Sequence, residues 1–185
     1  MIQSYRDLKE YLREDVRVSH VPQNTIKRWL HMIHGNEQCH ALRYTRCLRI
    51  CEFLGNKHFR LLYHIYRWKL SLLGLKYGLR INENAVGKGL NIIHLAGGGG
   101  AIINCDSMGE YCSIQSGVVI GANCGNKPVI GNHVDLGLGC KVYGAITIGD
   151  NSYILPNAVV THDVPANAIV GGIPAKVIKY RDPIE

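Results

Sequence analysis

The sequence lacks features that mark several common protein classes. No apolar run is long enough to cross a membrane, because the most apolar stretch, Leu61 to Leu79, contains Arg67, Lys69 and Lys76. Positions 6–10 are mostly charged, where a secretory signal needs apolar residues. The composition argues against a disordered chain, because 46% of the 185 residues are hydrophobic and only 19% are charged. We therefore expect a folded, cytoplasmic protein of one or two small domains.

The short motifs of disulfide, metal and nucleotide sites are missing as well. The seven cysteines are an odd number, and they include no CxxC pair and no zinc-finger spacing to histidines. Neither GxxxxGKS/T nor GxGxxG occurs, and no alternating strand and helix pattern surrounds the glycine run at 97–100. We therefore expect free thiols, no metal site and no nucleotide loop of the P-loop or Rossmann type.

Charge and glycine divide the chain into two unlike parts. Residues 1–77 contain 14 Lys and Arg against 6 Asp and Glu, whereas residues 78–185 contain 7 against 8. Four of the 21 glycines stand at or before residue 78, and 17 stand after residue 86. These shifts predict a helical N-terminal domain over 1–77, a second domain over 78–180 and a C-terminal tail over 181–185.

The first part has the spacing of amphipathic helices. Apolar side chains at positions 5, 8, 11 and 12 share one face after Ser4, a suitable helix cap. Further helices are predicted from Asn24 to Gly35, from Leu42 to Leu54 and from His58 to Leu73. Their basic residues form either a solvated face or a face for a membrane surface or a polyanion, and no aromatic-interleaved nucleic-acid motif accompanies them. The residues of this basic face are Arg43, Arg46, Arg49, Arg60, Arg67 and Lys69.

The second part has a period of six residues. Every sixth residue from 130 to 160 is a branched aliphatic, and the residues four places further on are mostly small or medium in size. A helix cannot produce this period and a hairpin meander has no reason to keep it, so the pattern predicts a parallel β-helix of stacked coils. The repeat positions are Ile130, Leu136, Val142, Ile148, Ile154 and Val160, and counting backwards adds Ile120, Ile114, Met108 and Ile102.

The repeat is interrupted at two places. Ile120 and Ile130 are ten positions apart, which predicts a loop around 123–128, and residues 94–100 contain no aliphatic in frame. Asp106 falls on a small corner position, where a buried carboxylate is costly unless it has a partner. Either the frame is irregular there or Asp106 has a polar neighbour.

His94 is the strongest candidate for chemistry. It stands in an interrupted coil, shortly before four glycines that would let a ligand approach the backbone. Because imidazole exchanges a proton near neutral pH, His94 is a candidate general base for a hydroxyl group. The alternative is a corner histidine bonded to a carbonyl. Lys127, in the other interruption, is either a contact for an anionic substrate or a solvated loop lysine.

Three segments of the second part carry a family resemblance. They are GKGLNIIH, which ends at His94, the repeats IGNHVDLGLGCKVYGAITIGDNSYILPNAVV, and the closing VPANAIVGGIPAKVIK. Over residues 79–180 the chain resembles the hexapeptide-repeat acyltransferases, in particular the serine acetyltransferase branch, and the helical part resembles it more loosely. The resemblance implies an α+β fold that is mainly β, with N-terminal helices followed by a left-handed parallel β-helix.

The same resemblance implies an enzyme that transfers acetyl directly from acetyl-CoA to a small hydroxyl acceptor, without a covalent enzyme intermediate. The family's catalytic histidine matches His94, and its cleft lies between neighbouring subunits of a homotrimer, with pairing of trimers as a further option. Substrate contacts are expected at Lys127 and Asp106. Coenzyme contacts are expected at Ala122, Asn123, Leu138, Gly139, Lys141, Pro156 and Lys176.

The chain departs from the serine acetyltransferase pattern around the acceptor. The segment LRINEN at 79–84 has no aspartate where the family has one, and Ile93 stands where the family has another. The histidine and arginine of the family's serine site align with Lys127 and Asn126. These departures make serine less secure as the acceptor than acetyl-CoA is as the donor.

Three interpretations follow from the resemblance and its departures. The first is a serine O-acetyltransferase-like enzyme, in which Asp106 or Glu83 is our hypothesis for the group that orients His94. The second is a sugar O-acetyltransferase of surface polysaccharide biosynthesis. The third is a catalytically silent β-helical binding scaffold, because solenoid faces are good interaction surfaces.

Overall fold

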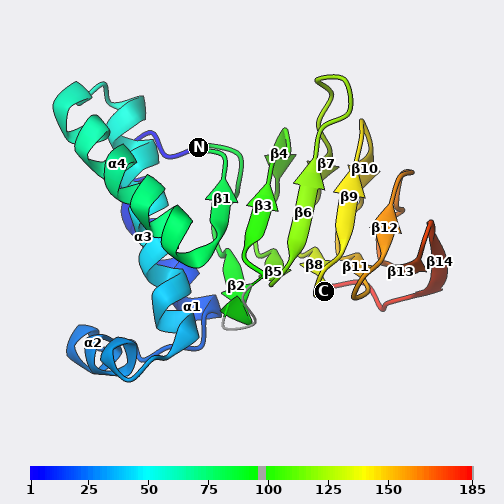
Figure 1. Cartoon of the computed structure of the whole chain (residues 1–185), viewed down its shortest axis with the longest axis horizontal. Coiled ribbons are helices and arrows are strands. Elements are labelled where there is room, and N and C mark those ends of the chain that lie inside the picture. Colours follow the sequence, from blue (N-terminus) through cyan, green and yellow to red (C-terminus); the bar gives the residue numbers. More distant parts are fainter. Residues whose placement is uncertain (96–98, 185) are drawn as a thin grey trace.

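The described residues, 1–95 and 99–184 of a computed structural model, form helices first and then a column of short strands. Figure 1 shows the helices gathered at one end of this column and the last two strands at the other end. The glycine run at 97–100 lies partly outside the described residues. The helices are α1 (Tyr5–Val18), α2 (Thr25–Ile33), α3 (Glu37–Asn56) and α4 (Arg60–Tyr77).

Side-chain caps fix where the first three helices begin. Ser4 and Asp7 form a reciprocal capping box at the start of α1, which confirms the predicted cap. Asn24 accepts two backbone hydrogen bonds at the start of α2, and Asn36 accepts one at the start of α3. Because of the second asparagine, α3 begins before the predicted Leu42.

The fourth helix is longer than the sequence pattern predicts. It passes the predicted end at Leu73 and stops at Tyr77, where Gly78 adopts a left-handed conformation with a φ of 67°. Gly74 lets the following strand approach, because a Cβ there would lie 2.7 Å from the carbonyl oxygen of Leu79. The last turn of α4 therefore packs directly on the start of the β-helix.

The strands form three parallel sheets that the chain enters in turn, as a β-helix requires. Sheet 1 has the order β1-β3-β6-β9-β12, sheet 2 has β4-β7-β10, and sheet 3 has β2-β5-β8-β11-β13 with β14 added in the antiparallel direction. The strands are β1 (Leu79–Ile81), β2 (Asn91–Ile93), β3 (Ala101–Ile103), β4 (Ser107–Met108), β5 (Ser113–Gln115), β6 (Val118–Gly121), β7 (Val129–Ile130), β8 (Asp135–Leu136), β9 (Lys141–Tyr143), β10 (Thr147–Ile148), β11 (Tyr153–Ile154), β12 (Val159–Val160), β13 (Ala168–Gly172) and β14 (Ala175–Tyr180).

The six-residue repeat positions form the core of the β-helix. Each repeat position from Ile130 to Val160 is 2% exposed or less. The corner positions four residues further on are buried too, among them Cys112, Cys140 and Ala158. This packing confirms the predicted parallel β-helix, because a period of six brings one aliphatic side chain of each short strand inside.

The backward count of the repeat is wrong by one residue at its far end. Ile103, and not Ile102, lies beside Ile120 in the inner register and is fully buried, whereas the side chain of Ile102 is 45% exposed. The slip places Cys105 at the inner corner and leaves Asp106 exposed. The frame is therefore irregular here, and Asp106 carries no burial cost.

The predicted basic face of the helices is correct except at Arg49. The side chain of Arg49 is fully buried and cannot belong to an exposed face, whereas the other five basic residues of that face are exposed. The seven cysteines are free, as expected, and Cys124 is exposed. Within residues 1–95 and 99–184, no helix has both the length and the apolar character needed to traverse a bilayer.

Candidate active site

His94 directly follows β2, at the corner where the chain turns from sheet 3 toward sheet 1. Its backbone has a φ of 63°, in the left-handed region that few residues other than glycine and asparagine occupy. The side chain is 59% exposed, and its Nδ1 lies 3.8 Å from Oε1 of Glu37. The imidazole is thus open to solvent beside a carboxylate, where it can exchange a proton with a bound hydroxyl.

Glu37 is the first residue of α3, where the helix dipole favours an acidic side chain. The two carboxylates expected from the sequence to orient His94, Asp106 and Glu83, are placed elsewhere. Glu83 forms an ion pair with Arg67, at 3.0 Å between Oε1 and Nε, and Asp106 lies at a different corner of the β-helix. Sequence reasoning missed Glu37, because no pattern links the start of a helix to a distant coil.

The corner that carries His94 is a column of left-handed residues. Gly100, Gly117, Gly139 and Asn157 occupy it on successive coils, with φ values from 52° to 76°. The N–H of Gly117 donates to the carbonyl of Gly100 at 2.6 Å. Because Cβ atoms are absent from three of these positions, an extended ligand can approach the backbone of this corner closely.

Four of the expected coenzyme contacts lie along this corner. Leu138 and Gly139 connect β8 to β9, and Pro156 follows β11, with Leu138 and Pro156 exposed. Lys141 also lies here, but its Nζ donates to the carbonyl oxygens of Gly117 at 2.8 Å and Gly139 at 2.7 Å. The charge of Lys141 is therefore held against the backbone of the corner.

The other expected contacts lie elsewhere. Lys176 is exposed on β14, and Ala122 and Asn123 lead into the loop between β6 and β7, at the corner between sheets 1 and 2. Asp106 and Lys127 are exposed at that second corner, where the N–H of Asp106 donates at 2.9 Å to the carbonyl of the residue after Lys127. Within one chain, sheet 1 separates this second corner from the corner of His94.

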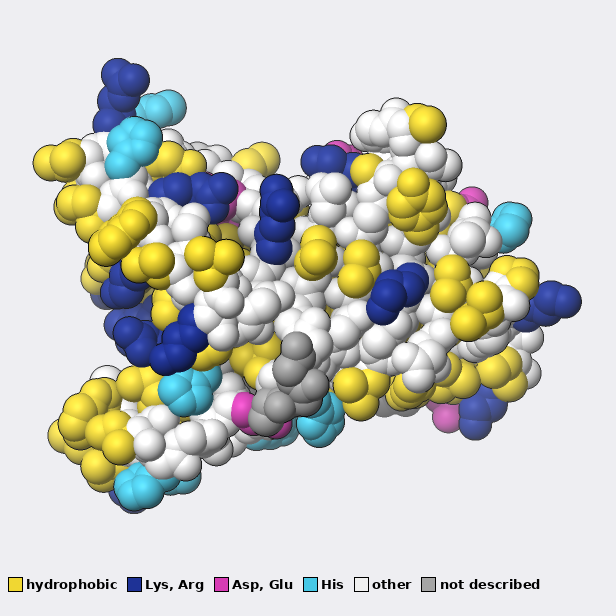
Figure 2. Space-filling model, viewed as in Figure 1, with side chains coloured by type: hydrophobic (Ala, Val, Ile, Leu, Met, Phe, Trp, Pro, Cys, Tyr) yellow, Lys and Arg dark blue, Asp and Glu magenta, His cyan; other side chains and the backbone are white. Residues whose placement is uncertain are grey.

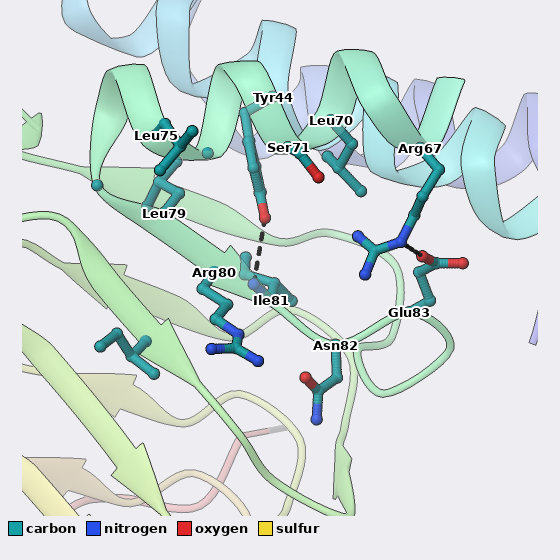
Figure 3. Close-up of a pocket in the computed structure, with 13 residues that line it drawn as sticks. Tyr44, Arg67, Leu70, Ser71, Leu75, Leu79, Arg80, Ile81, Asn82 and Glu83 are labelled. Carbon is teal, nitrogen blue, oxygen red and sulfur yellow. Dashed lines mark hydrogen bonds and ion pairs between the residues drawn. The ribbon is translucent and has the colours of Figure 1, made fainter. Parts of the chain in front are cut away.

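A cavity of about 650 Å³ opens between α4 and β1, on the outer side of sheet 1 (Figure 3). Its apolar wall includes Leu75 and Ile102, and its polar side contains Arg80 together with the ion pair of Arg67 and Glu83. Sequence analysis did not predict this cavity, because it arises from the way α4 packs on the first strand.

Tyr44 lines the back of the same cavity. Its hydroxyl accepts a hydrogen bond of 3.1 Å from the N–H of Ile81, which fixes the strand against α3. Burial raises the pKa of Tyr44 to about 12, so the phenol remains protonated at neutral pH. Gly78, at the edge of the cavity, accepts a hydrogen bond from the N–H of Ala101, so the cavity adjoins the His94 corner.

In the part of the chain that the structure describes, no group of three or more His, Cys, Asp or Glu side chains is placed to hold a metal ion.

Known proteins with similar sequences indicate the family of this chain. No family model matches the chain. A serine acetyltransferase of Synechococcus elongatus is 37% identical over 73% of this chain and 55% of its own length. A serine acetyltransferase of Helicobacter pylori is 36% identical over 71% of this chain and 77% of its own length. The chain thus spans about half of the first relative and three quarters of the second.

Solved structures agree with this placement at the level of the fold. A Neisseria gonorrhoeae serine acetyltransferase matches with a TM-score of 0.74 and 22% identity, over 98% of this chain and 70% of that one. A serine acetyltransferase described as a complex with CoA matches with a TM-score of 0.71 and 20% identity, over 95% of this chain and 72% of that one. The fold is that of the left-handed β-helix acyltransferases, as expected. The chain belongs to the serine acetyltransferase family.

Proposed function

We propose that this protein is an acetyl-CoA-dependent O-acetyltransferase in which His94 is the general base. The observation that carries the proposal is the exposed imidazole of His94 at a glycine-lined corner, in a chain 36–37% identical to serine acetyltransferases. The ring nitrogen remote from Glu37 takes the proton of the acceptor hydroxyl as its oxygen attacks the thioester carbonyl. Collapse of the tetrahedral intermediate expels the coenzyme thiolate, which recovers the proton, and leaves the acetyl ester.

The coenzyme site is assigned to the column of left-handed residues and its flanks. A family structure described as a complex with CoA supports acetyl-CoA as the donor. Leu138, beside Gly139, and Pro156, on the next coil, are exposed along this corner, and Lys176 offers an exposed positive charge for phosphate. Lys141 then acts by fixing the corner backbone, since its ammonium group already bonds two carbonyl oxygens.

A homotrimer is the second part of the proposal. His94 lies at the corner before the strands of sheet 1, and Asp106 and Lys127 lie at the corner after them. These residues line a common cleft only if two copies of the chain pack together. The outer face of sheet 1 supports such packing, because Ile102 and Tyr143 on it are 45% and 49% exposed. Ala122 and Asn123 at the second corner then contact the coenzyme that a neighbouring copy holds.

Serine is the first acceptor to test, because the related proteins are named for it and one family structure is described as a complex with serine. A sugar hydroxyl is the second candidate. Arg80 lines the cavity beside β1, where the family resemblance places an aspartate, so the surroundings of the acceptor are more basic than the family pattern. We place the protein in the cytoplasm, where seven free thiols remain reduced.

The test is acceptor-dependent release of CoA thiol from acetyl-CoA, with L-serine and a panel of sugars. His94→Asn keeps a residue that tolerates the left-handed backbone and removes the base, so turnover should fall roughly 10²- to 10⁴-fold. His133→Asn is the matched control, because His133 also has a positive φ, of 54°, but lies at the corner between sheets 2 and 3. Equal activity of the two variants would contradict the role of His94. Acetyl-CoA binding without thiol release from any acceptor would favour the binding scaffold.

A further inference from the structure

Helix α4 carries an apolar stripe on the side that faces away from the protein. Five residues spaced alternately four and three positions apart share this side, and each is at least 48% exposed. On the opposite side of the helix, Leu70 and Leu73 are buried against the rest of the protein. The α4 stripe consists of Leu61, Ile65, Trp68, Leu72 and Leu75.

Positive charges flank the α4 stripe, and the helix itself contains no acidic residue, although Arg67 is paired with Glu83 from the segment after β1. Residues 53–82 contain six Lys and Arg and no Asp or Glu. At 100° per residue, Lys69 and Lys76 lie on one side of the stripe, and Arg60 and Arg67 lie on the other. Long basic side chains in such positions can extend toward charged groups while their stems cover apolar surface.

Helix α2 repeats the same arrangement on a smaller scale. Its exposed apolar residues are Ile26, Trp29, Leu30 and Ile33, and none of its residues is buried. Residues 16–36 contain Arg17, Lys27 and Arg28 and no acidic residue. Figure 2 shows both hydrophobic areas at the helical end of the molecule, with Lys and Arg side chains between them.

We propose that the α4 stripe and the exposed face of α2 dock the protein on an anionic phospholipid surface. Exposed Trp and Leu side chains flanked by Lys and Arg fit the boundary between acyl chains and anionic headgroups. Each cation near such a surface adds about 1 kcal/mol of attraction. Packing of α4 against α4 of a second copy fits less well, because it would bring Arg60, Lys69 and Lys76 of the two helices together, and neither helix contains a carboxylate to neutralise them. The proposal does not depend on the reaction that the β-helix carries out.

The two tryptophans of the chain allow a direct test, because Trp29 and Trp68 lie on the two proposed contact faces. The full-length protein is mixed with vesicles of phosphatidylcholine alone or of phosphatidylcholine with phosphatidylglycerol. We expect a blue shift of tryptophan fluorescence and co-flotation with the anionic vesicles, both weakened by salt. Trp29→Phe isolates the signal of Trp68.

Two variants test the stripe and its charges separately. W68S/L72S should weaken vesicle binding roughly tenfold or more, and K69E/K76E should weaken it in a salt-dependent way. I173S/I178S is the matched control, because both of its side chains are exposed at the other end of the molecule. Circular dichroism and thermal melting verify that each variant is folded.

Either of two results would overturn the proposal. One is the absence of binding to anionic vesicles, or binding that W68S/L72S leaves unchanged. The other is self-association without lipid that W68S/L72S abolishes, which would assign the stripe to a second copy of the chain.

Discussion

Arg49 of α3 and Asp15 of α1 form a fully buried ion pair, with Nε 2.9 Å from Oδ2. The guanidinium also donates to the carbonyl oxygens of Val86 and Gly87 in the first coil of the β-helix. The other carboxylate oxygen of Asp15 accepts a hydrogen bond from the N–H of Leu90. These contacts join two helices to the β-helix through a single side chain, so the helical part and the first coil are expected to unfold together.

Arg49→Met tests this connection. Removal of the guanidinium leaves the buried carboxylates of Asp15 and Glu52 without their cation, so the free energy of unfolding should fall by about 3–5 kcal/mol. Chemical denaturation of the purified protein measures the change. Arg43→Met is the control, since Arg43 is exposed on the same helix and its loss should cost about 0.5 kcal/mol or less. Similar losses in the two variants would contradict the role assigned to Arg49.

Glu37→Gln tests how much the neighbouring carboxylate contributes to His94. The pair is partly exposed, at 59% and 31% for the two side chains, so its electrostatic energy is small. We expect turnover to fall less than about tenfold, well below the effect of His94→Asn. Separate values of kcat and KM are the second readout, because a group that only orients the base should lower kcat and leave the KM for acetyl-CoA unchanged. An unchanged kcat would show that Glu37 has no positioning role.

Alkaline pH should destabilise the β-helix through its corner cysteines. Burial raises the pKa of Cys105 to about 11 and the pKa values of Cys112 and Cys140 to about 12, from an ordinary 9.0. Unfolded thiols therefore ionise at a pH where the folded ones stay neutral. Since the unfolded state then binds fewer protons, stability is unaffected at neutral pH and is lost as the pH rises above 9.0.

The melting temperature measured from about pH 8.5 to about pH 10.5 tests this linkage. Replacing the three corner cysteines by alanine, the residue that Ala158 places at an equivalent corner, should make the decline shallower. Cys124→Ala is the control, because Cys124 is exposed and its removal should leave the slope unchanged. A slope that the triple replacement does not alter would assign the alkaline loss to other groups.

The sequence predicted the β-helix well where one local rule repeats. Each repeat position from Ile130 to Val160 needs only an aliphatic side chain every sixth residue, and all of them are buried. The count failed at Ile102, because adjacent isoleucines satisfy either frame and only the strand pairing of Ile103 decides between them. A slip of one residue in a strand reverses which side chains face the core.

The candidate site was only partly predictable for a related reason. His94 could be identified, because it interrupts the repeat and ends a segment that resembles a family motif. Its neighbour Glu37 and the cavity beside Arg80 depend on how α3 and α4 pack against the first coil. The hydrogen bonds from Lys141 to two carbonyl oxygens likewise form only because successive coils lie close together. Contacts between elements distant in sequence leave no local pattern to read.

Gly100→Ala tests whether the corner geometry holds the segment that carries His94. Gly100 has a φ of 52°, and a Cβ there would lie 2.1 Å from the carbonyl oxygen of Gly78. The left-handed backbone costs a non-glycine residue about 1–2 kcal/mol, and the clash adds about 1–3 kcal/mol because the first two coils must separate. The free energy of unfolding and the rate of thiol release from acetyl-CoA should therefore both decrease.

The control for this variant is Gly125→Ala. Gly125 also has a positive φ, of 89°, but an added Cβ would meet nothing within 4 Å. It should lose about 1–2 kcal/mol from the backbone alone. The difference between the two variants therefore isolates the contact of Gly100 with Gly78. If both variants lost the same stability, the close approach of the coils would contribute nothing, and the glycine would be needed only for its backbone conformation.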